Sequence, residues 1–171
     1  LASRFTYHNI DKKIIWFDVP KCASTTIRSL KKLDLRRGNL PADSSEYFKF
    51  AVVRNPFDRI VSSWKMFTTP RVEELQSYNE SFIEGLGNFD LKQFLQLIKI
   101  IDNHHWHPQS DFIALDLDYI IRFESLQQDF NVVCDKIGLP HQNLPLTNKS
   151  EHEHYSKYYT DEAREIVAEK Y

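Results

Sequence analysis

A lysine and three hydroxyl residues lie close together near the start of the chain, in the stretch "WFDVPKCASTTIRSL". An apolar segment leads into Lys21, and the hydroxyl residues Ser24, Thr25 and Thr26 follow it. Where a strand turns into a helix, backbone N–H groups converge on a bound anion, and nearby lysine and hydroxyl groups add further donors. The stretch therefore predicts a site for a phosphate-type anion. An ordinary N-capped helix with a surface lysine is the competing interpretation.

The same stretch differs from the common nucleotide-binding loop, because it contains no glycine and lacks the Walker A ending Gly-Lys-Ser/Thr. Its lysine comes before the turn instead of at the end of it. The hydroxyl group that would bind Mg²⁺ directly after that lysine is therefore missing. This disfavours a metal-bound triphosphate and favours an anion whose terminal group carries less charge.

A second candidate anion site lies in "VVRNPFDRIVSSW". Arg54 ends an apolar run, and the proline two positions later suits the first position of a helix, which places Ser62 almost two turns into that helix. An arginine fork together with a hydroxyl group binds phosphate strongly, and Arg59 and Ser63 are neighbours that could assist. In the competing interpretation, Arg54 pairs with Asp58, and Ser62 bonds its own helix backbone. Two such sites on adjacent turns predict a ligand with anionic groups at two ends.

Histidines cluster in "DNHHWHPQ", which contains His104, His105 and His107. Histidine is the usual general base near neutral pH, so this cluster is the first place to look for one. Glu124 is an alternative base, although a capping or ion-pair role at a strand end explains it as well. A zinc site at these histidines, or at "EHEHY", is the remaining interpretation, but further ligands are not evident.

The elements that must position these residues alternate along the chain. Short apolar runs rich in β-branched and aromatic residues predict buried strands at 13–19, 47–53 and 117–123. Helical spacing with capping and stop signals predicts helices at 24–33, 56–67, 89–102, 126–139 and 159–171. This alternation predicts an α/β fold with a mainly parallel sheet, in which ligands bind at the carboxyl ends of the strands. The polar stretch 68–88 is a candidate lid or acceptor-binding segment.

The chain totals bound the possible functions. Residues 1–171, of which 42% are hydrophobic, are expected to form a single domain. Because the sequence begins with Leu and stops within a helical pattern, we interpret it as a domain excised from a longer chain. A formal net charge of -2 argues against broad binding to nucleic acid or membrane surfaces. No apolar run is long enough to span a membrane. Two cysteines are too few for a disulfide scaffold.

In combination, "PKCASTT" and "RNPFDRIVSSW" resemble the two cofactor-binding motifs of sulfotransferases that use 3′-phosphoadenosine 5′-phosphosulfate (PAPS). The likeness is closest to the carbohydrate sulfotransferases, of the family 2 type. The segments 104–112, 120–130 and 155–171 are also similar to that group, in the same order. The resemblance implies a P-loop-like, three-layer α/β fold with a central mainly parallel sheet flanked by helices.

The resemblance also implies a reaction and a role for each motif. The sulfuryl group would move from PAPS to a hydroxyl group of an acceptor, which in that family is a carbohydrate, and adenosine 3′,5′-bisphosphate would leave, with no metal required. The 5′-phosphosulfate would be held by Lys21, Ala23, Ser24, Thr25 and Thr26, with Ala23 acting through its backbone. The 3′-phosphate would be held by Arg54 and Ser62. Lys21 would stabilise developing charge, and His105 matches the family's His-Trp-x-Pro-Gln pattern as the first candidate for the base.

Two other functions remain open from the sequence: a small-molecule kinase of the P-loop type, and a non-catalytic module that retains only a nucleotide pocket. The kinase interpretation requires ATP and Mg²⁺, against which the lysine placement counts. Compactness, few cysteines and the lack of an anchor favour a cytoplasmic enzyme of a bacterial or viral type, and the Golgi lumen is the alternative for a domain excised from an anchored protein.

Overall fold

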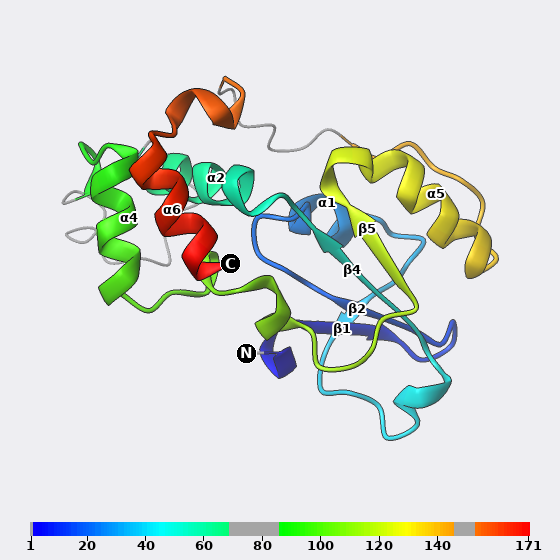
Figure 1. Cartoon of the computed structure of the whole chain (residues 1–171). Helices are drawn as coiled ribbons and strands as arrows, with labels where there is room; N and C mark the ends of the chain where they lie inside the picture. The colour runs from blue at the N-terminus through cyan, green and yellow to red at the C-terminus, as the bar shows by residue number, and fades with distance from the viewer. Residues whose placement is uncertain (1, 69–85, 146–152) are drawn as a thin grey trace. The chain divides into compact units, whose positions relative to one another are not determined.

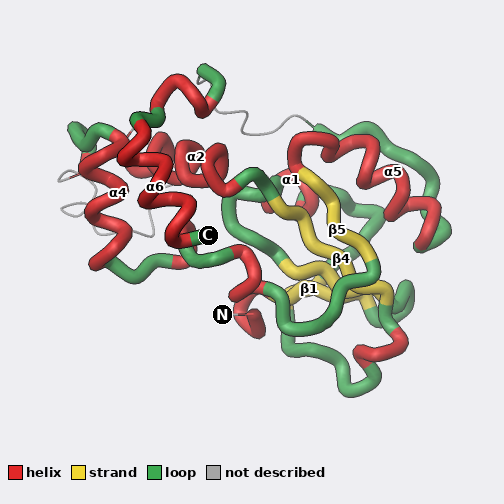
Figure 2. Tube along the Cα trace, in the orientation of Figure 1, coloured by secondary structure: helices red, strands yellow, loops and turns green. Residues whose placement is uncertain are grey.

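The computed structural model describes residues 2–68, 86–145 and 153–171. They form two compact units, which are treated one at a time. Unit 1 comprises Leu1–Asn55 and Pro108–Lys149, and unit 2 comprises Pro56–His107 and Ser150–Tyr171. The labelled strands all belong to unit 1, and helices α2, α4 and α6 belong to unit 2 (Figures 1 and 2). A single domain over residues 1–171 stays a prediction.

Unit 1 is built on a five-stranded sheet of order β3-β1-β2-β4-β5. Its strands are β1 (Thr6–Asn9), β2 (Ile14–Phe17), β3 (Arg36–Arg37), β4 (Phe48–Val53) and β5 (Tyr119–Arg122). β2 is parallel to β4, and β4 is parallel to β5, whereas β1 is antiparallel to both β2 and β3. All the strands except β1 therefore run in one direction. The predicted α/β class with a mostly parallel central sheet is confirmed.

The three predicted strands differ in burial: β4 buries its centre, and β5 buries only Ile121. All four residues of β2 are buried, as the near-continuous apolar run 13–19 predicts for a strand covered on both faces. The two remaining strands were not predicted, since β1 reads "TYHN" and β3 reads "RR", and neither shows a hydrophobic pattern. β1 is instead held by pairing with β2, across which the rings of Tyr7 and Trp16 lie 5.1 Å apart.

Two helices of unit 1 share its core with the strands: α1 (Ser24–Arg28) and α5 (Leu126–Lys136). The predicted helix 24–33 is wrong beyond Arg28. Three β-branched residues in its first turn have low helix propensity, and the Ser29 hydroxyl bonds back to the Thr26 carbonyl at 2.7 Å, which competes with continuation. α5 ends as predicted: Gly138 has a φ of 69°, and the Leu139 N–H donates to the Cys134 carbonyl at 2.9 Å, closing a Schellman motif.

Short 3₁₀ turns complete unit 1. They are Ala2–Phe5, Ser44–Glu46, Gln109–Phe112 and Phe123–Ser125. The turn Gln109–Phe112 comes soon after the segment that contains His105, and the turn Phe123–Ser125 directly follows β5 and contains Glu124. Burial raises the pKa of the Cys134 thiol, which lies in the core on α5.

Unit 2 is helical in the parts that the structure describes. Its helices are α2 (Pro56–Thr68), α4 (Leu91–Ile100) and α6 (Asp161–Lys170), with 3₁₀ turns at His104–Trp106 and Tyr155–Tyr158. The three helices match the predicted segments 56–67, 89–102 and 159–171. Asp90 begins α4 with a capping box to Gln93, and the Thr160 hydroxyl accepts the Ala163 N–H at the start of α6. None of the described helices is long and apolar enough to cross a membrane.

Aromatic contacts form the core of unit 2. The rings of Phe67 and Phe94 both meet Trp106 edge-on, at centroid distances of 5.5 and 5.4 Å. Two tyrosines pack against this core, of which Tyr159 is buried and Tyr171 is partly buried. The Tyr159 hydroxyl donates to the Phe57 carbonyl at 2.9 Å, and the Tyr171 hydroxyl donates to the Trp106 carbonyl. Burial raises the pKa of both phenols well above 10, because the charged form would lose its hydration.

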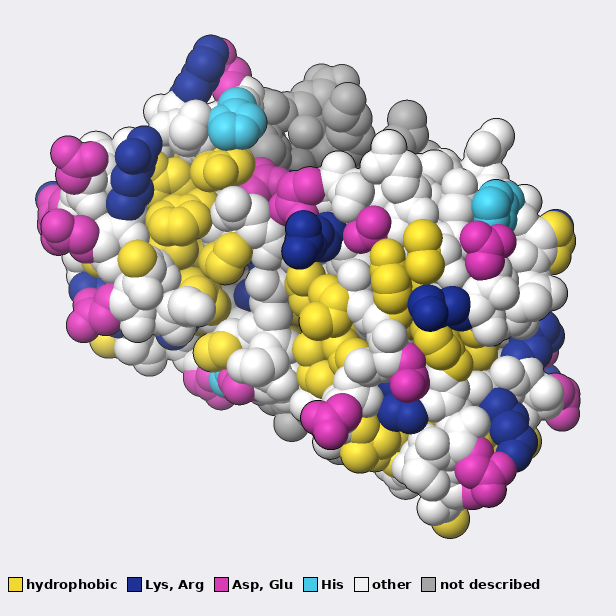
Figure 3. All heavy atoms as spheres, turned by 45° about the vertical axis from the view of Figure 1, so that its right-hand side comes forward, with side chains coloured by type: hydrophobic (Ala, Val, Ile, Leu, Met, Phe, Trp, Pro, Cys, Tyr) yellow, Lys and Arg dark blue, Asp and Glu magenta, His cyan; other side chains and the backbone are white. Residues whose placement is uncertain are grey.

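Charged side chains are mixed on the molecular surface. On the face drawn in Figure 3, basic and acidic side chains of the described residues lie among hydrophobic ones and do not gather into one basic area. This agrees with the formal net charge of -2.

Candidate functional site

The turn after β2 has a backbone suited to an anion. Lys21 and Ala23 both adopt left-handed conformations, with φ values of 68° and 60°, although neither is glycine. Backbone that changes between right-handed and left-handed conformations turns successive N–H groups toward one side and makes an anion-binding concavity. Lys21 and Ala23 therefore adopt the left-handed conformation that glycine residues usually provide in such a loop. The side chain of Lys21 is half-buried at this turn.

A buried carboxylate holds the base of this turn. Asp18 follows β2 directly and has no exposed surface. Its two oxygens take different partners: one accepts the Ser24 hydroxyl at 2.5 Å, and the other pairs with the guanidinium of Arg28. Since Ser24 and Arg28 are the first and last residues of α1, Asp18 fixes both ends of this short helix. In this arrangement the Ser24 hydroxyl proton points to Asp18, which leaves the oxygen as an acceptor.

The two threonines of the predicted loop differ in exposure. Thr25 is exposed, whereas Thr26 is buried and its hydroxyl lies 3.4 Å from the Pro145 carbonyl. Cys22 is fully buried between Lys21 and Ala23, and its thiol donates to the Gln109 side-chain oxygen at 3.3 Å. The hydroxyl groups of the loop are therefore partly engaged in holding its shape.

Arg54 lies beside this turn, because β4 is the parallel neighbour of β2 and Arg54 directly follows it. The Arg54 side chain is mostly buried, with 8% exposed. Its Nη1 donates to the Lys21 carbonyl at 3.2 Å, and its guanidinium lies over the Phe123 ring, 4.2 Å from the centroid. The structure therefore brings the first motif and the arginine of the second together at one edge of the sheet, where the order of the strands predicts ligands to bind.

Side chains from elsewhere in unit 1 hold the backbone that carries this arginine. The Gln109 amide oxygen accepts the Arg54 N–H at 3.0 Å, and the Gln109 amide nitrogen donates to the Arg54 carbonyl at 2.8 Å. The next N–H, of Asn55, donates to a Glu124 carboxylate oxygen at 2.7 Å. Glu124 thus caps the end of this segment, as the competing interpretation of that residue expected.

Ser62 belongs to unit 2, where it lies buried on α2. Arg59 and Ser63, the neighbours that could assist Ser62 in binding phosphate, both have partners within unit 2. The Arg59 guanidinium is buried and donates to the His107 carbonyl at 2.7 Å, and the Ser63 hydroxyl donates to the His105 carbonyl at 3.0 Å. Arg59 and Ser63 therefore hold the histidine segment 104–107 against α2.

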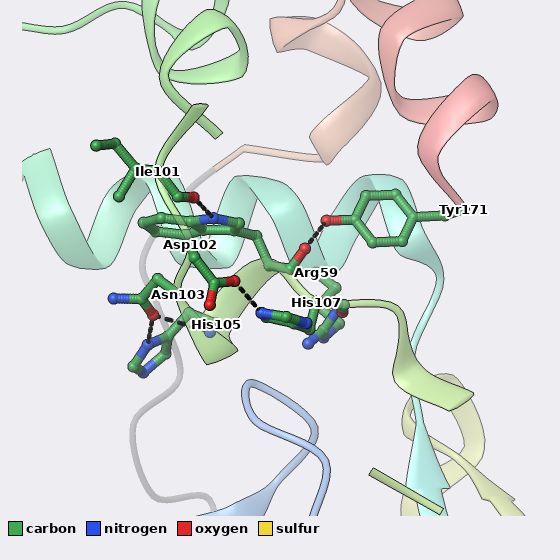
Figure 4. A network of polar contacts seen from close by, with 8 residues as sticks. Arg59, Ile101, Asp102, Asn103, His105, His107 and Tyr171 are labelled. Carbon is green, nitrogen blue, oxygen red and sulfur yellow. Dashed lines mark hydrogen bonds and ion pairs between the residues drawn. The ribbon is translucent and has the colours of Figure 1, made fainter. Parts of the chain in front are cut away.

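Polar contacts orient the backbone and the rings of the histidine segment (Figure 4). The Asn103 side-chain oxygen accepts the His105 backbone N–H at 3.0 Å, which fixes the orientation of the amide. The same oxygen lies 2.8 Å from His105 Nδ1, so Nδ1 carries the proton and Nε2 is the basic nitrogen. The His105 ring also packs edge-on against Phe67 at 5.4 Å.

His107 has a different orienting partner. Its Nε2 pairs with the carboxylate of Asp102, as Figure 4 shows, so its Nδ1 is the basic nitrogen. Both rings therefore have a defined tautomer, one set by an amide and the other by a carboxylate. A histidine whose ring is oriented by a third group is the usual arrangement for a general base.

A protein-family model described as "Sulfotransferase family", of the type 2, carbohydrate-type group, matches residues 28–171. The chain belongs to the sulfotransferase family. The match covers most of the chain, including Arg54, Ser62 and the histidine segment. The loop from Lys21 to Thr26 precedes it, and its role therefore depends on the motif and on the geometry described above. No curated protein and no solved structure matches the sequence.

Some parts of this sulfotransferase lie outside the described residues. They include most of the predicted lid 68–88 and the loop around Lys149. Within residues 2–68, 86–145 and 153–171, no group of three or more His, Cys, Asp or Glu side chains is arranged to hold a metal ion.

The sulfotransferase also contains contact residues that the sequence did not reveal. The sequence predicts no role for Asp18 or Gln109, although both lie in the segments that carry the motifs. For Gln109 a signal existed, since it is the last residue of the His-Trp-x-Pro-Gln pattern. For Asp18 no sequence signal separates it from any other polar residue that follows a strand.

Proposed function

We propose that this sulfotransferase moves the sulfuryl group of PAPS to a hydroxyl group of a carbohydrate acceptor. The observation that carries the proposal is the 3.2 Å hydrogen bond from the Arg54 guanidinium to the Lys21 carbonyl. It joins two anion-binding motifs that are distant in sequence. A ligand with a phosphosulfate at one end and a phosphate at the other fits such a pair better than a ligand with one anionic group.

The residues of the loop suit the phosphosulfate end. Lys21 adds a positive charge at a turn with left-handed backbone, in which the Cys22 N–H donates to the Val19 carbonyl at 3.1 Å and the backbone N–H of Ala23 is the proposed donor to the anion. Thr25 and Thr26 supply hydroxyl groups, while Ser24 acts mainly through its bond to Asp18. Bound PAPS supplies a sulfuryl group with adenosine 3′,5′-bisphosphate as its leaving group. Lys21 stabilises the charge that develops on the oxygen between sulfur and phosphorus.

The second motif suits the phosphate at the other end. Arg54 is held by Phe123 and by the Lys21 carbonyl, so its guanidinium is fixed before any ligand arrives. Ser62 is the proposed hydroxyl partner of the same phosphate. The family implies this role for both residues.

His105 is the proposed general base that takes the proton of the acceptor hydroxyl. Its basic nitrogen is Nε2, because Nδ1 bonds to Asn103. The carbohydrate class of the acceptor is supported by the resemblance of the motifs to carbohydrate sulfotransferases. The family match favours sulfuryl transfer over the kinase and the non-catalytic module.

Ligand binding followed by transfer of label tests the proposal. Adenosine 3′,5′-bisphosphate should raise the thermal stability of the protein, by about 2.7 kcal/mol at 100 times its Kd, and ATP with Mg²⁺ should not. Label from [³⁵S]PAPS should then appear on members of a glycan panel, with simple alcohols as comparison acceptors. Stabilisation by ATP with Mg²⁺ alone excludes the proposed donor, and transfer only to non-sugar alcohols excludes the proposed acceptor class.

A further inference from the structure

The side chain of Gln109 contacts both anion-binding motifs of unit 1. Its amide oxygen accepts the Arg54 N–H at 3.0 Å and the Cys22 thiol at 3.3 Å. Its amide nitrogen donates to the Arg54 carbonyl at 2.8 Å. The Arg54 backbone fixes the orientation of the amide, because an N–H must face the oxygen and a carbonyl must face the nitrogen. Gln109 is therefore a clamp joining the loop that contains Lys21 to the residue that follows β4.

The clamp occupies a position where the sheet no longer holds the chain. β4 ends at Val53, so the Arg54 N–H and carbonyl lie beyond the ladder that pairs β4 with β5. Gln109 bonds both groups, in the manner of a neighbouring strand. Because the backbone of Arg54 is fixed in this way, its guanidinium is directed to the Lys21 carbonyl and the Phe123 ring.

We propose that Gln109 is a positioning residue that sets the recognition of the cosubstrate's 3′-phosphate by holding Arg54 against the Lys21 loop. The inference rests on the proposed function, in which Arg54 binds that phosphate. Gln109 itself touches neither the phosphate nor the reacting atoms in this account. It acts through the Arg54 backbone.

The test compares two nucleotides that differ only in the 3′-phosphate. Dissociation constants of adenosine 3′,5′-bisphosphate and adenosine 5′-monophosphate are measured by calorimetry, and their ratio gives the 3′-phosphate selectivity. In Gln109→Met, which keeps the length but removes both hydrogen bonds to Arg54, the ratio should fall about tenfold, and binding of the monophosphate should change little. In an Arg54→Ala background, Gln109→Met should cause no further loss of selectivity.

Gln127 provides a matched control in the same unit. It also clamps backbone, since its amide accepts the Leu144 N–H at 2.8 Å and donates to the Gln142 carbonyl at 3.1 Å. Gln127→Met should cost similar thermal stability and keep the wild-type selectivity. If Gln109→Met does not fold, Gln109→Asn, which keeps the amide but is shorter by one methylene, should show the same loss of selectivity.

The outcomes separate the two proposals. A wild-type protein that binds the two nucleotides equally overturns the proposed donor, and the role of Gln109 with it. If the wild type is selective and Arg54→Ala removes the selectivity, an unchanged ratio in Gln109→Met overturns the positioning role alone. An equal loss of affinity for both nucleotides in Gln109→Met also overturns it, because general support of the fold would then explain the effect.

Discussion

The two units hold their candidate residues by different means. In unit 1, Lys21 and Arg54 come from the ends of parallel strands, and polar side chains bond directly to the backbone that carries them. In unit 2, His105 and His107 lie in a short turn that is packed on aromatic rings and tied to α2 through their carbonyl oxygens. Strand register thus gathers the candidate anion-binding groups, whereas helix packing orients the proposed proton acceptors. This difference suggests that changes in unit 1 affect donor binding and changes in the histidines affect turnover.

His105→Gln is the change with the largest expected effect on turnover. Loss of a general base typically reduces the rate by about 10²–10⁴. Binding of adenosine 3′,5′-bisphosphate should remain as in the wild type, which sharpens the contrast between the units. The two measurements are kcat for transfer of the label and, by calorimetry, the Kd of adenosine 3′,5′-bisphosphate. His141→Gln is the control, since the His141 ring also bonds to a side-chain oxygen, that of Asp135, but lies in unit 1. Full activity in His105→Gln together with loss in His107→Gln would move the base to His107.

Lys21→Ala tests the charge at the loop. Removal of one donor that stabilises developing charge typically lowers the rate by about 10²–10³, and we expect a loss in that range for kcat with PAPS. Lys31→Ala, at an exposed lysine beyond α1, is the control and should keep wild-type rates. A normal kcat in Lys21→Ala would show that the charge of the loop contributes nothing to the reaction.

Arg54→Ala tests the link between the motifs. A hydrogen bond to a charged group contributes about 1.5–3 kcal/mol, which corresponds to a rise of roughly 10- to 150-fold in the Kd of adenosine 3′,5′-bisphosphate. Arg54→Lys should recover only part of the loss, because a lysine cannot reproduce the planar fork. Arg36→Ala, at an exposed arginine on β3, should bind normally. Equal binding by Arg54→Ala and the wild type would contradict the assignment of unit 1 to the donor.

Alkaline pH tests the packing of unit 2. The pKa values of Tyr159 and Tyr171 are raised by burial, so above pH 10 the unfolded chain loses these protons while the folded chain keeps them. Stability from both groups is therefore fully present below about pH 10 and falls above it, by about 1.4 kcal/mol per pH unit for each tyrosine. Denaturant melts from pH 8 to 11 measure the slope. Tyr171→Phe should flatten it, and Tyr119→Phe in unit 1 should not; identical slopes in all three proteins would contradict the account.

Asp90→Ala has the smallest expected effect. Loss of the capping box at α4 should lower the free energy of unfolding by about 1 kcal/mol, with donor binding unchanged. Thr160→Ala, which removes the cap of α6, should behave in the same way. Denaturant unfolding gives the free energy of unfolding, and calorimetry gives the Kd of adenosine 3′,5′-bisphosphate. Weaker donor binding in Asp90→Ala would contradict the expectation that changes in unit 2 leave donor binding unchanged.

The sequence predicted most of the elements, and the reasons are local. Apolar runs located β2, β4 and β5, and capping residues such as Asp90 and Thr160 located helix starts within one or two residues. The short α1 and the polar strands β1 and β3 were mispredicted or missed, because their conformations depend on neighbours in space. β3, for example, consists of two arginines, and its pairing with β1 has no counterpart in its own sequence.

The candidate site was predictable in its residue types but not in its supports. Two anion motifs after adjacent strands placed Lys21 and Arg54 at one edge, and the structure brings them together. The contacts of Gln109 join segments that meet only after folding, so spacing along the chain carries little information about them. The partners of Asp18 and Asp102 are near in sequence, but their contacts depend on the exact backbone of the turns between them. The role of the predicted site residues themselves stays a prediction until the variants are measured.

The left-handed conformations of Lys21 and Ala23 have a consequence for affinity. A side chain in that region raises the energy of the folded loop by about 1–2 kcal/mol per residue, but it also restricts the unfolded chain far more than glycine would. The bonds of Asp18, Gln109 and Arg54 hold the loop in this conformation before an anion enters, so the ligand does not have to freeze a flexible segment. Ala23→Gly would relieve the conformational strain of the loop. The glycine loop would be more flexible in the folded protein, so the entropy cost of ordering it would oppose ligand binding instead of folding.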